Sequence, residues 1–468
     1  MKTLDQIEPR AAISSLPFTI AAPGSYYFTT NLAALVASNG ITIAASGVTV
    51  DLMGFELVGG FVGLNAVAVS GSRSNIVVRN GLVRDWAADG VDLLSAVNSQ
   101  IRDICVLRCG RGVRTGSSSV VQGCAARTNT LGGIVTSVAS IVMGSVASGN
   151  GFDGISVGVG SSVLDCVSYN NNSDGILAGS GCTVQRCQVY NNKEAGIHGS
   201  DNCLVENCNV YNSTTSGIFL LSGCQVRGCN SSGNNLHGIS LASGGNVSDC
   251  TTYNNTGSGI LAGSGCKVSD CVSGVNDVDG IEASFGSSII DCVSYNNAGR
   301  GINAGSGNLV RGAAVYSNTG TGVSGADGCM IQQCSVYDNT TNGVAVSVGA
   351  VVSGCVLRNN GGVGIRASSS SRIENNQCTA NGVAGIETTS TDNRIDGNHV
   401  SGGGFGIHCL ASGNLVIRNS VASAGTNFEL VANNRVGVVI SATNSPAISG
   451  SSGVSGFGTS DPWANVSF

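Results

Sequence analysis

Three residues of different charge occupy one position of a repeat near the end of the chain. Arg366, Glu387 and His408 are 21 residues apart, and each follows a Gly by two residues. If these segments are coils whose strands stack roughly 4.8 Å apart, the three side chains lie in one line. A cation and two proton-transferring groups are what β-elimination or C5 epimerisation of a uronate requires. The alternative, which we favour, is a surface ion-pair ladder of little energetic worth.

The repeat that positions these residues is a Gly followed by Ile or Val. It returns every 21 residues, at Gly112, Gly133, Gly154, Gly175, Gly196, Gly217, Gly238, Gly259, Gly280, Gly301, Gly322, Gly343, Gly364, Gly385 and Gly406. Counting that Gly as zero, small or apolar residues at +1, +3, +7, +9, +12 and +14 form three runs of period two, which is the strand signal. Three short strands per repeat predict an all-β solenoid, a parallel β-helix. About 17 coils would make a rod of about 80 Å.

Two columns of polar or thiol side chains run through the repeat. Position +17 is Asn in most coils, and we expect a ladder at a sharp corner; its members are Asn150, Asn171, Asn192, Asn234, Asn255, Asn276, Asn297, Asn318, Asn339, Asn360 and Asn381. Most of the 19 Cys fall at +12 or +7, and we interpret them as buried free thiols that act as small hydrophobes. A disulfide such as Cys182 to Cys187 is the alternative. The spacing does not match a zinc site.

Tyrosines occupy the outward position +15. They are Tyr169, Tyr190, Tyr211, Tyr253, Tyr295, Tyr316 and Tyr337. Aromatic rings in a row can stack on sugar rings, which predicts carbohydrate binding, or they can stack on one another and stabilise the sheet. We favour mutual stacking.

The pattern Cys-x-Val-x-x-Cys-x-Val-x-x-Asn from Cys182 to Asn192, closed by Gly196-Ile197, resembles parallel β-helix repeat proteins of the NosD-like, pectate-lyase-like superfamily. The resemblance covers about Gly40 to Asn427. It implies a right-handed coil and a bias toward polysaccharide lyases, hydrolases, epimerases and surface proteins, whose active sites lie on the exterior of one sheet. Such a fold specifies function poorly.

The catalytic signatures of these enzymes are missing from the sequence. No two Asp residues are adjacent, and Ile197-His198-Gly199 lacks the partners of a polygalacturonase-like set. Asp249, Asp270 and Asp291 could hold calcium if they converge, although corner carboxylates usually only face solvent. Four acidic residues, one histidine and one arginine also lie just before the repeat Gly, where we expect turn roles; they are Asp153, Asp174, Glu194, Asp279, His237 and Arg300.

Composition bounds the remaining expectations. We expect an N-terminal cap over 1–39, the β-helix over 40–430 and a capping tail over 431–468. The net charge of −6 argues against nucleic acid, and we find no signal peptide or membrane-spanning stretch. Free thiols favour a cytoplasmic location, whereas the resemblance favours the cell surface or outside.

These observations leave three functional hypotheses. We favour a rigid, non-catalytic carbohydrate-binding or structural protein that needs no cofactor, with a polysaccharide as its partner. The second hypothesis is a lyase or epimerase, for which calcium is the alternative cofactor. The third is a self-assembling homo-oligomer.

Overall fold

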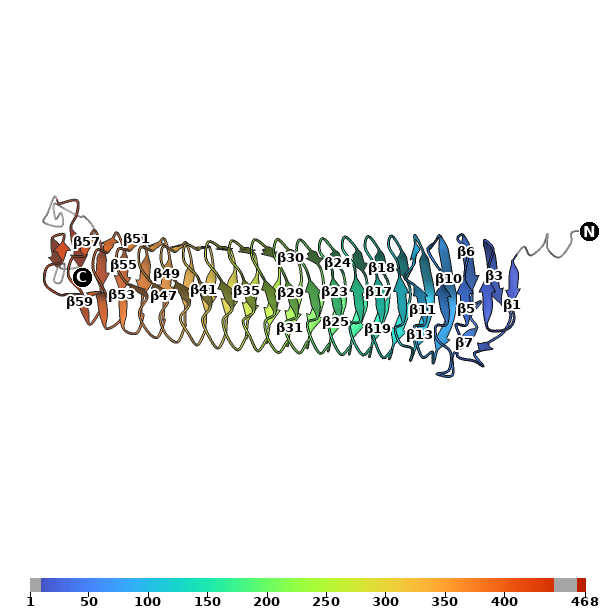
Figure 1. Cartoon of the computed structure of the whole chain (residues 1–468). Helices are drawn as coiled ribbons and strands as arrows, with labels where there is room; N and C mark the ends of the chain where they lie inside the picture. Colours follow the sequence, from blue (N-terminus) through green and yellow to red (C-terminus); the bar gives the residue numbers. More distant parts are fainter. Residues whose placement is uncertain (1–9, 442–460) are drawn as a thin grey trace, which may run out of the picture. The chain divides into compact units, whose positions relative to one another are not determined.

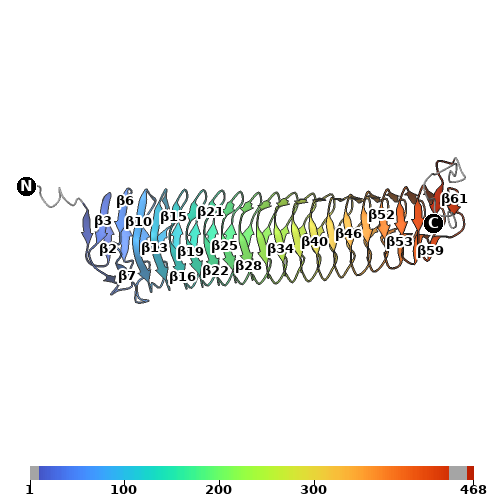
Figure 2. The same cartoon turned by 180° about the vertical axis from the view of Figure 1, so that it is seen from behind.

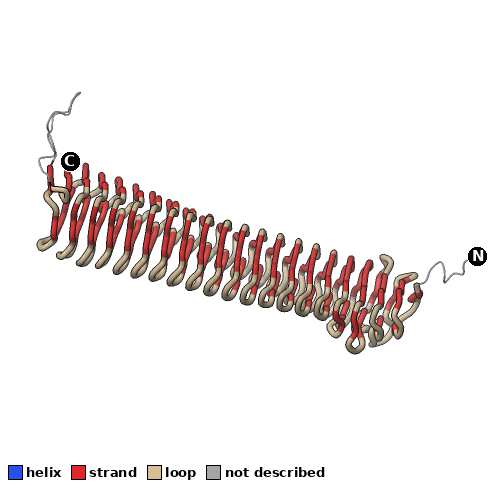
Figure 3. Tube along the Cα trace, turned by 90° about the horizontal axis from the view of Figure 1, so that it is seen from above, coloured by secondary structure: helices blue, strands red, loops and turns tan. Residues whose placement is uncertain are grey.

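The computed structural model describes residues 10–441 and 461–468. Those residues form strands and loops without a helix (Figure 3). They divide into unit 1, Met1–Ser240, and unit 2, Leu241–Phe468. None of the described residues lies in a helix that is long and apolar enough to cross a membrane.

A regular coil of unit 1 shows how the repeat folds. It consists of β23 (Ile176–Ala178), β24 (Thr183–Gln185) and β25 (Gln188–Tyr190). Ile176, Val184 and Val189 are fully buried, whereas Leu177 and Tyr190 point outward and stay partly exposed. The period-two interpretation of the sequence is therefore confirmed.

Successive coils of each unit pair in parallel, with partners 21 residues apart. In unit 1 the first strands of the regular coils are β14 (Val113–Thr115), β17 (Ile134–Thr136), β20 (Ile155–Val157), β23, β26 (Ile197–Gly199) and β29 (Ile218–Leu220) (Figure 1). In unit 2 they are β35 (Ile260–Ala262), β38 (Ile281–Ala283), β41 (Ile302–Ala304), β44 (Val323–Gly325), β47 (Val344–Val346), β50 (Ile365–Ala367), β53 (Ala384–Thr388), β56 (Phe405–Cys409) and β59 (Thr426–Leu430).

The third strands of the coils carry the tyrosines and pair in the same parallel way. In unit 1 they include β19 (Val146–Ser148), β22 (Val167–Tyr169), β25, β28 (Asn209–Tyr211) and β31 (Asn230–Ser232) (Figure 2). In unit 2 they include β34 (Thr251–Tyr253), β37 (Val272–Gly274), β40 (Val293–Tyr295), β43 (Ala314–Tyr316), β46 (Ser335–Tyr337) and β49 (Val356–Arg358).

The described residues form about 20 coils rather than the predicted 17 or so. Counting first strands gives ten in unit 1, nine in unit 2, and β32 (Ile239–Leu241), which spans the boundary. The sequence count was low because coils before the strict repeat lack its period. Already β2 (Phe18–Ile20) pairs in parallel with β5 (Ile41–Ile43). The division into cap, β-helix and tail stays a prediction.

The corners explain the Gly and Asn columns. A Cβ on Gly175 would lie 2.3 Å from Val189 Cγ1 and 2.6 Å from Asn192 Nδ2, so the repeat Gly is required by crowding. Asn171 donates from both its backbone N and its Nδ2 to Asn192 Oδ1, at 3.0 Å each. This confirms the buried Asn ladder. The left-handed backbone lies one residue earlier, as at Asn191 with φ 56°.

The cysteines are all free, and every one but Cys105 is buried. The disulfide alternative, Cys182 to Cys187 included, is therefore wrong. Burial raises the pKa of Cys109 to about 12 and that of Cys124 to about 12, so these thiols stay protonated. Because the thiols are shielded from solvent, their number is no argument for a reducing compartment.

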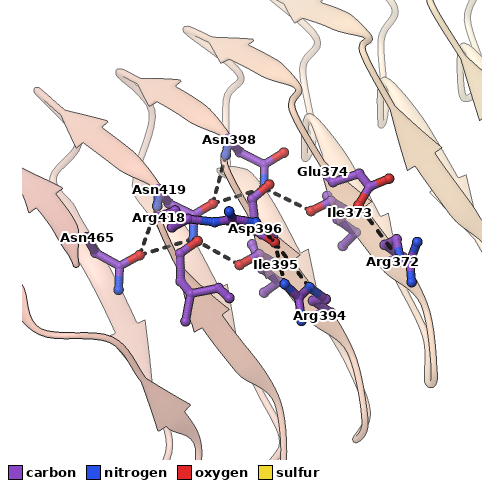
Figure 4. Close-up of polar contacts among 11 residues, drawn as sticks. Arg372, Ile373, Glu374, Arg394, Ile395, Asp396, Asn398, Arg418, Asn419 and Asn465 are labelled. Atoms are coloured by element: carbon purple, nitrogen blue, oxygen red, sulfur yellow. Dashed lines mark hydrogen bonds and ion pairs between the residues drawn. The ribbon is translucent and has the colours of Figure 1, made fainter. Parts of the chain in front are cut away.

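Near the end of unit 2 the thiol column gives way to a second Asn column (Figure 4). Asn398 Nδ2 donates to Asn419 Oδ1 at 3.0 Å, and Asn419 Nδ2 donates to Asn465 Oδ1 at 3.2 Å. Asn465 belongs to β62 (Asn465–Ser467), which pairs with β58 (Ser420–Ala422). On the outer side Asp396 accepts hydrogen bonds from Arg394 and Arg418, both at 2.7 Å. The last residues thus continue the hydrogen-bonding pattern of the coils.

Candidate functional site

The structure brings Arg366, Glu387 and His408 together on adjacent strands of unit 2. Their backbones are in register across β50, β53 and β56. Arg366 Nε lies 3.2 Å from Glu387 Oε1, and His408 Nδ1 lies 3.3 Å from Glu387 Oε2. The expected stacking is therefore present, and the catalytic role of these residues stays a prediction.

The three side chains of this triad mainly contact one another. Glu387 is only 7% exposed, and each of its carboxylate oxygens faces a charged or ionisable partner. The His408 ring stacks on Phe405 with 4.5 Å between centroids. The adjoining hollow, beside Arg366, has a volume of about 170 Å³ and is lined mainly by small residues such as Ser347 and Ser368. Both oxygens of the buried Glu387 carboxylate therefore already lie against neighbouring side chains.

The tyrosine column forms one ladder in each unit. In unit 1 the rings of Tyr169, Tyr190 and Tyr211 lie 4.9 Å apart at each step, with planes within 5° of parallel. Ring faces therefore contact each other, as the favoured interpretation expects. Tyr211 is the last ring, and its partner on the next coil is Ser232. Among the described residues no ring or guanidinium covers the Ser232 side of Tyr211.

The ladder of unit 2 is closed at both ends. Tyr295, Tyr316 and Tyr337 stack at 5.5 and 5.0 Å. The Arg358 guanidinium carbon lies 4.4 Å above the Tyr337 ring. At the other end the Tyr295 ring covers Gly274, where a Cβ would lie 2.5 Å from Tyr295 Cζ. No face of these three rings is left for a ligand.

The surroundings of the two ladders also differ. Beside the unit 1 ladder the outward side chain on the Tyr169 strand is Val167, and the next three are exposed amides, Gln188, Asn209 and Asn230. Beside the unit 2 ladder the same position holds Val293, Ala314, Ser335 and Val356. Tyr253 is 46% exposed, without a ring contact in the described part of unit 2, and shares its strand with Thr251. Only the unit 1 ladder combines an open ring face with amides.

The three aspartates that could hold calcium if they converged lie at corners of the coils. Asp249, Asp270 and Asp291 have left-handed φ angles of 55°, 56° and 53°. Short polar side chains tolerate this conformation. Over residues 10–441 and 461–468 no group of three or more His, Cys, Asp or Glu side chains is placed to hold a metal. Calcium binding at these aspartates stays a prediction.

A histidine pocket in unit 1 was missed by the sequence reasoning. His198 Nδ1 lies 2.9 Å from Asp174 Oδ2, and the pocket above them, of about 320 Å³, also contains Glu194, Phe219 and Leu236. The hydrogen bond to Asp174 raises the pKa of His198. Asp174 was expected to serve a turn, and its Oδ1 does accept from Ala195 N at 2.9 Å. Comparing the position before Gly with position +2 of the next coil would have revealed the pair.

Comparison with solved structures found distant likenesses, all at low identity. The A-module of mannuronan C-5 epimerase AlgE4 from Azotobacter vinelandii matches 83% of this chain and 89% of its own, with 12% identity and a TM-score of 0.20. Pectate lyase Pel9A matches 62% of this chain and 69% of its own, with 14% identity and a TM-score of 0.29. At such identities the likeness is one of fold alone.

The sequence itself matches one family. No curated protein matches the chain. Residues 179–319 and 304–452 match the family described as "Right handed beta helix region", which together is more than half of the chain. The protein therefore belongs to the right-handed β-helix family.

Proposed function

We propose that the protein is a non-catalytic β-helix that binds carbohydrate through the tyrosine ladder of unit 1. The observation that carries this proposal is that Tyr211 ends its stack opposite the small Ser232 and beside the exposed amides of Asn209 and Asn230. The unit 2 ladder, with its ends closed, contributes stability rather than binding.

The chemistry of the Tyr211 patch suits a sugar ring. One face of a pyranose is apolar C–H, which packs against an aromatic ring, while its hydroxyls need donors and acceptors in fixed directions. Asn and Gln side chains supply both. Ser232 is small enough to leave room over the ring. One such contact contributes about 1 kcal/mol, so useful affinity for a polymer needs several contacts along the chain.

The triad in unit 2 supports the non-catalytic part of the proposal. Glu387 is buried and already lies against Arg366 and His408, so its carboxylate is not free for a uronate. The hollow beside it is also smaller than the 300 Å³ or so of ordinary ligand sites.

The rival function is a uronate lyase or epimerase at this triad. It is favoured by the fact that the three side chains do meet, with His408 Nδ1 3.3 Å from Glu387 Oε2 and Arg366 Nε 3.2 Å from Glu387 Oε1. A base aligned by a cation could then abstract a proton from a bound sugar.

The test is binding and turnover on a panel of neutral and acidic polysaccharides, with calcium present and chelated. We expect binding of at least one polymer without the ultraviolet absorbance of an unsaturated product and without epimerisation. Turnover that disappears in Glu387→Gln and persists in the control Glu282→Gln, at the same position of another unit 2 coil, would establish the rival. Absence of both binding and turnover would leave a structural or self-assembling role, and the mass in solution would then separate those two.

A further inference from the structure

The pocket around His198 lies on a different face of unit 1 from the tyrosine ladder. It opens over the first strands of the coils, where Leu177, His198 and Phe219 are in register on β23, β26 and β29. The loop before each repeat Gly supplies the other wall, with Glu194 and Leu236. The ladder side chains, in contrast, stand on the third strands.

One side of this pocket is apolar and accessible. Phe219 is 37% exposed and Leu236 is 45% exposed. The Phe219 ring meets His198 through an edge contact, with 5.1 Å between centroids and planes at 68°. Unlike the stacked tyrosines, these two rings do not lie face to face. A volume of about 320 Å³ is within the range of small-molecule sites.

The other side is a set of oriented polar groups. Asp174 is 4% exposed, and it accepts from Ala195 N through one oxygen and contacts His198 Nδ1 through the other. The contact with Asp174 fixes the orientation of the imidazole. The other ring nitrogen, Nε2, has no hydrogen-bond partner among the described residues and is available to a ligand. Glu194 accepts from Ser173 Oγ at 3.0 Å, which orients its carboxylate at the rim.

The charge of the pocket decides which sugars fit. Asp174 and Glu194 line it, Asp153 accepts from Asp174 N at 3.2 Å just beside it, and neither Lys nor Arg is among its lining residues. Burial raises the pKa of Asp153, and the basic group that lines the pocket, His198, is already engaged by Asp174. A uronate would bring a further negative charge into this field.

We propose that the His198 pocket is a second carbohydrate site, selective for sugars without a carboxylate. A pyranose packs its apolar face on Phe219 and Leu236, and its hydroxyls bond His198 Nε2 and Glu194. This goes beyond the Tyr211 patch, because it adds an independent site on other strands and a rule for which sugars enter it.

The experiment is a calorimetric titration of the full chain with cellotetraose and, separately, with tetragalacturonate. We expect cellotetraose to bind at least tenfold more tightly than tetragalacturonate. Phe219→Ala should weaken cellotetraose binding at this site about tenfold, while Phe285→Ala, an exposed Phe on unit 2, should leave it unchanged. Glu194→Gln should reduce the difference in affinity between cellotetraose and tetragalacturonate, because it removes one negative charge from the pocket.

The outcomes separate the two proposals. Binding that survives Tyr211→Ala and is lost in Phe219→Ala supports the pocket. Binding that is lost in Tyr211→Ala and unaffected by Phe219→Ala overturns the pocket and leaves the proposed function standing. Equal affinity for tetragalacturonate and cellotetraose, or no binding of cellotetraose, would also overturn the proposal that the His198 pocket is a carbohydrate site. A circular-dichroism melt of each variant confirms that it is folded.

Discussion

The two tyrosine ladders are built from the same column of the same repeat, yet they present different surfaces. In unit 1 the stack ends at Tyr211, which faces Ser232 and stands beside amides. In unit 2 the stack runs from the space over Gly274 to the guanidinium of Arg358. A row of tyrosines is therefore not in itself a binding site. The residues at the same position one coil before and one coil after decide whether a ring face remains free.

The strongest test of the difference between the ladders is to cover the end of the unit 1 ladder with an Arg, as Arg358 covers the end of the unit 2 ladder. Ser232→Arg places a guanidinium opposite Tyr211, as Arg358 stands opposite Tyr337. We expect polysaccharide binding at the ladder to fall by about tenfold or more, because the ring face is then covered. Affinity electrophoresis of the unmodified protein and of Ser232→Arg in polysaccharide-containing gels measures this loss of binding, with Ser232→Ala as the control. Unchanged binding in Ser232→Arg would mean that the ring face is not used.

Removing one amide tests the polar half of the site. Asn230→Ala takes away hydrogen bonds to a sugar and leaves Tyr211 in place. A net hydrogen bond contributes about 1 kcal/mol, so we expect affinity to fall roughly threefold to tenfold. A change at the same repeat position of unit 2, Ser335→Ala on the strand of Tyr337, should have no effect on binding in the same calorimetric titration. A loss in Ser335→Ala as large as in Asn230→Ala would contradict the assignment to unit 1.

Opening the closed ladder has the smallest expected effect. Arg358→Ala uncovers Tyr337 and removes a cation–π contact of about 0.5–1 kcal/mol, so the melting temperature should drop slightly. We expect no strong binding to appear, since Val293, Ala314 and Val356 offer the sugar no hydrogen bonds and Ser335 offers only one hydroxyl. If Arg358→Ala gave the unit 2 ladder the same polysaccharide affinity as the unit 1 ladder, the Arg358 cap alone would account for the difference between the two ladders.

Most of the fold could be predicted from the sequence because its period is strict. The inward positions, the buried Asn ladder and the parallel register follow from a 21-residue repeat whose alternate residues are apolar. The coil count could not be read in the same way, since the first coils, such as that of β2 and β5, pair in parallel without sharing the repeat. Free thiols were favoured over disulfides, and the structure bears this out.

The candidate sites were harder to predict from the sequence, because each is formed by side chains from different coils. Alignment of Arg366, Glu387 and His408 was visible as one column, and the structure brings them into contact. The pair of Asp174 and His198 joins two different columns on adjacent coils, so no single column reveals it. Which tyrosine has an open face depends on ring orientation, and spacing alone does not determine that.

The measurement that most directly tests the central claim compares Tyr211→Ala with Tyr316→Ala. Each protein is titrated with a polysaccharide that the unmodified protein binds, and each is melted in the absence of ligand. Tyr211→Ala should lose about tenfold in affinity. Tyr316→Ala should bind normally and lose about 1–3 kcal/mol of stability, because it removes two ring-stacking contacts. Normal binding by Tyr211→Ala, or an equal loss of affinity in both proteins, would contradict the account.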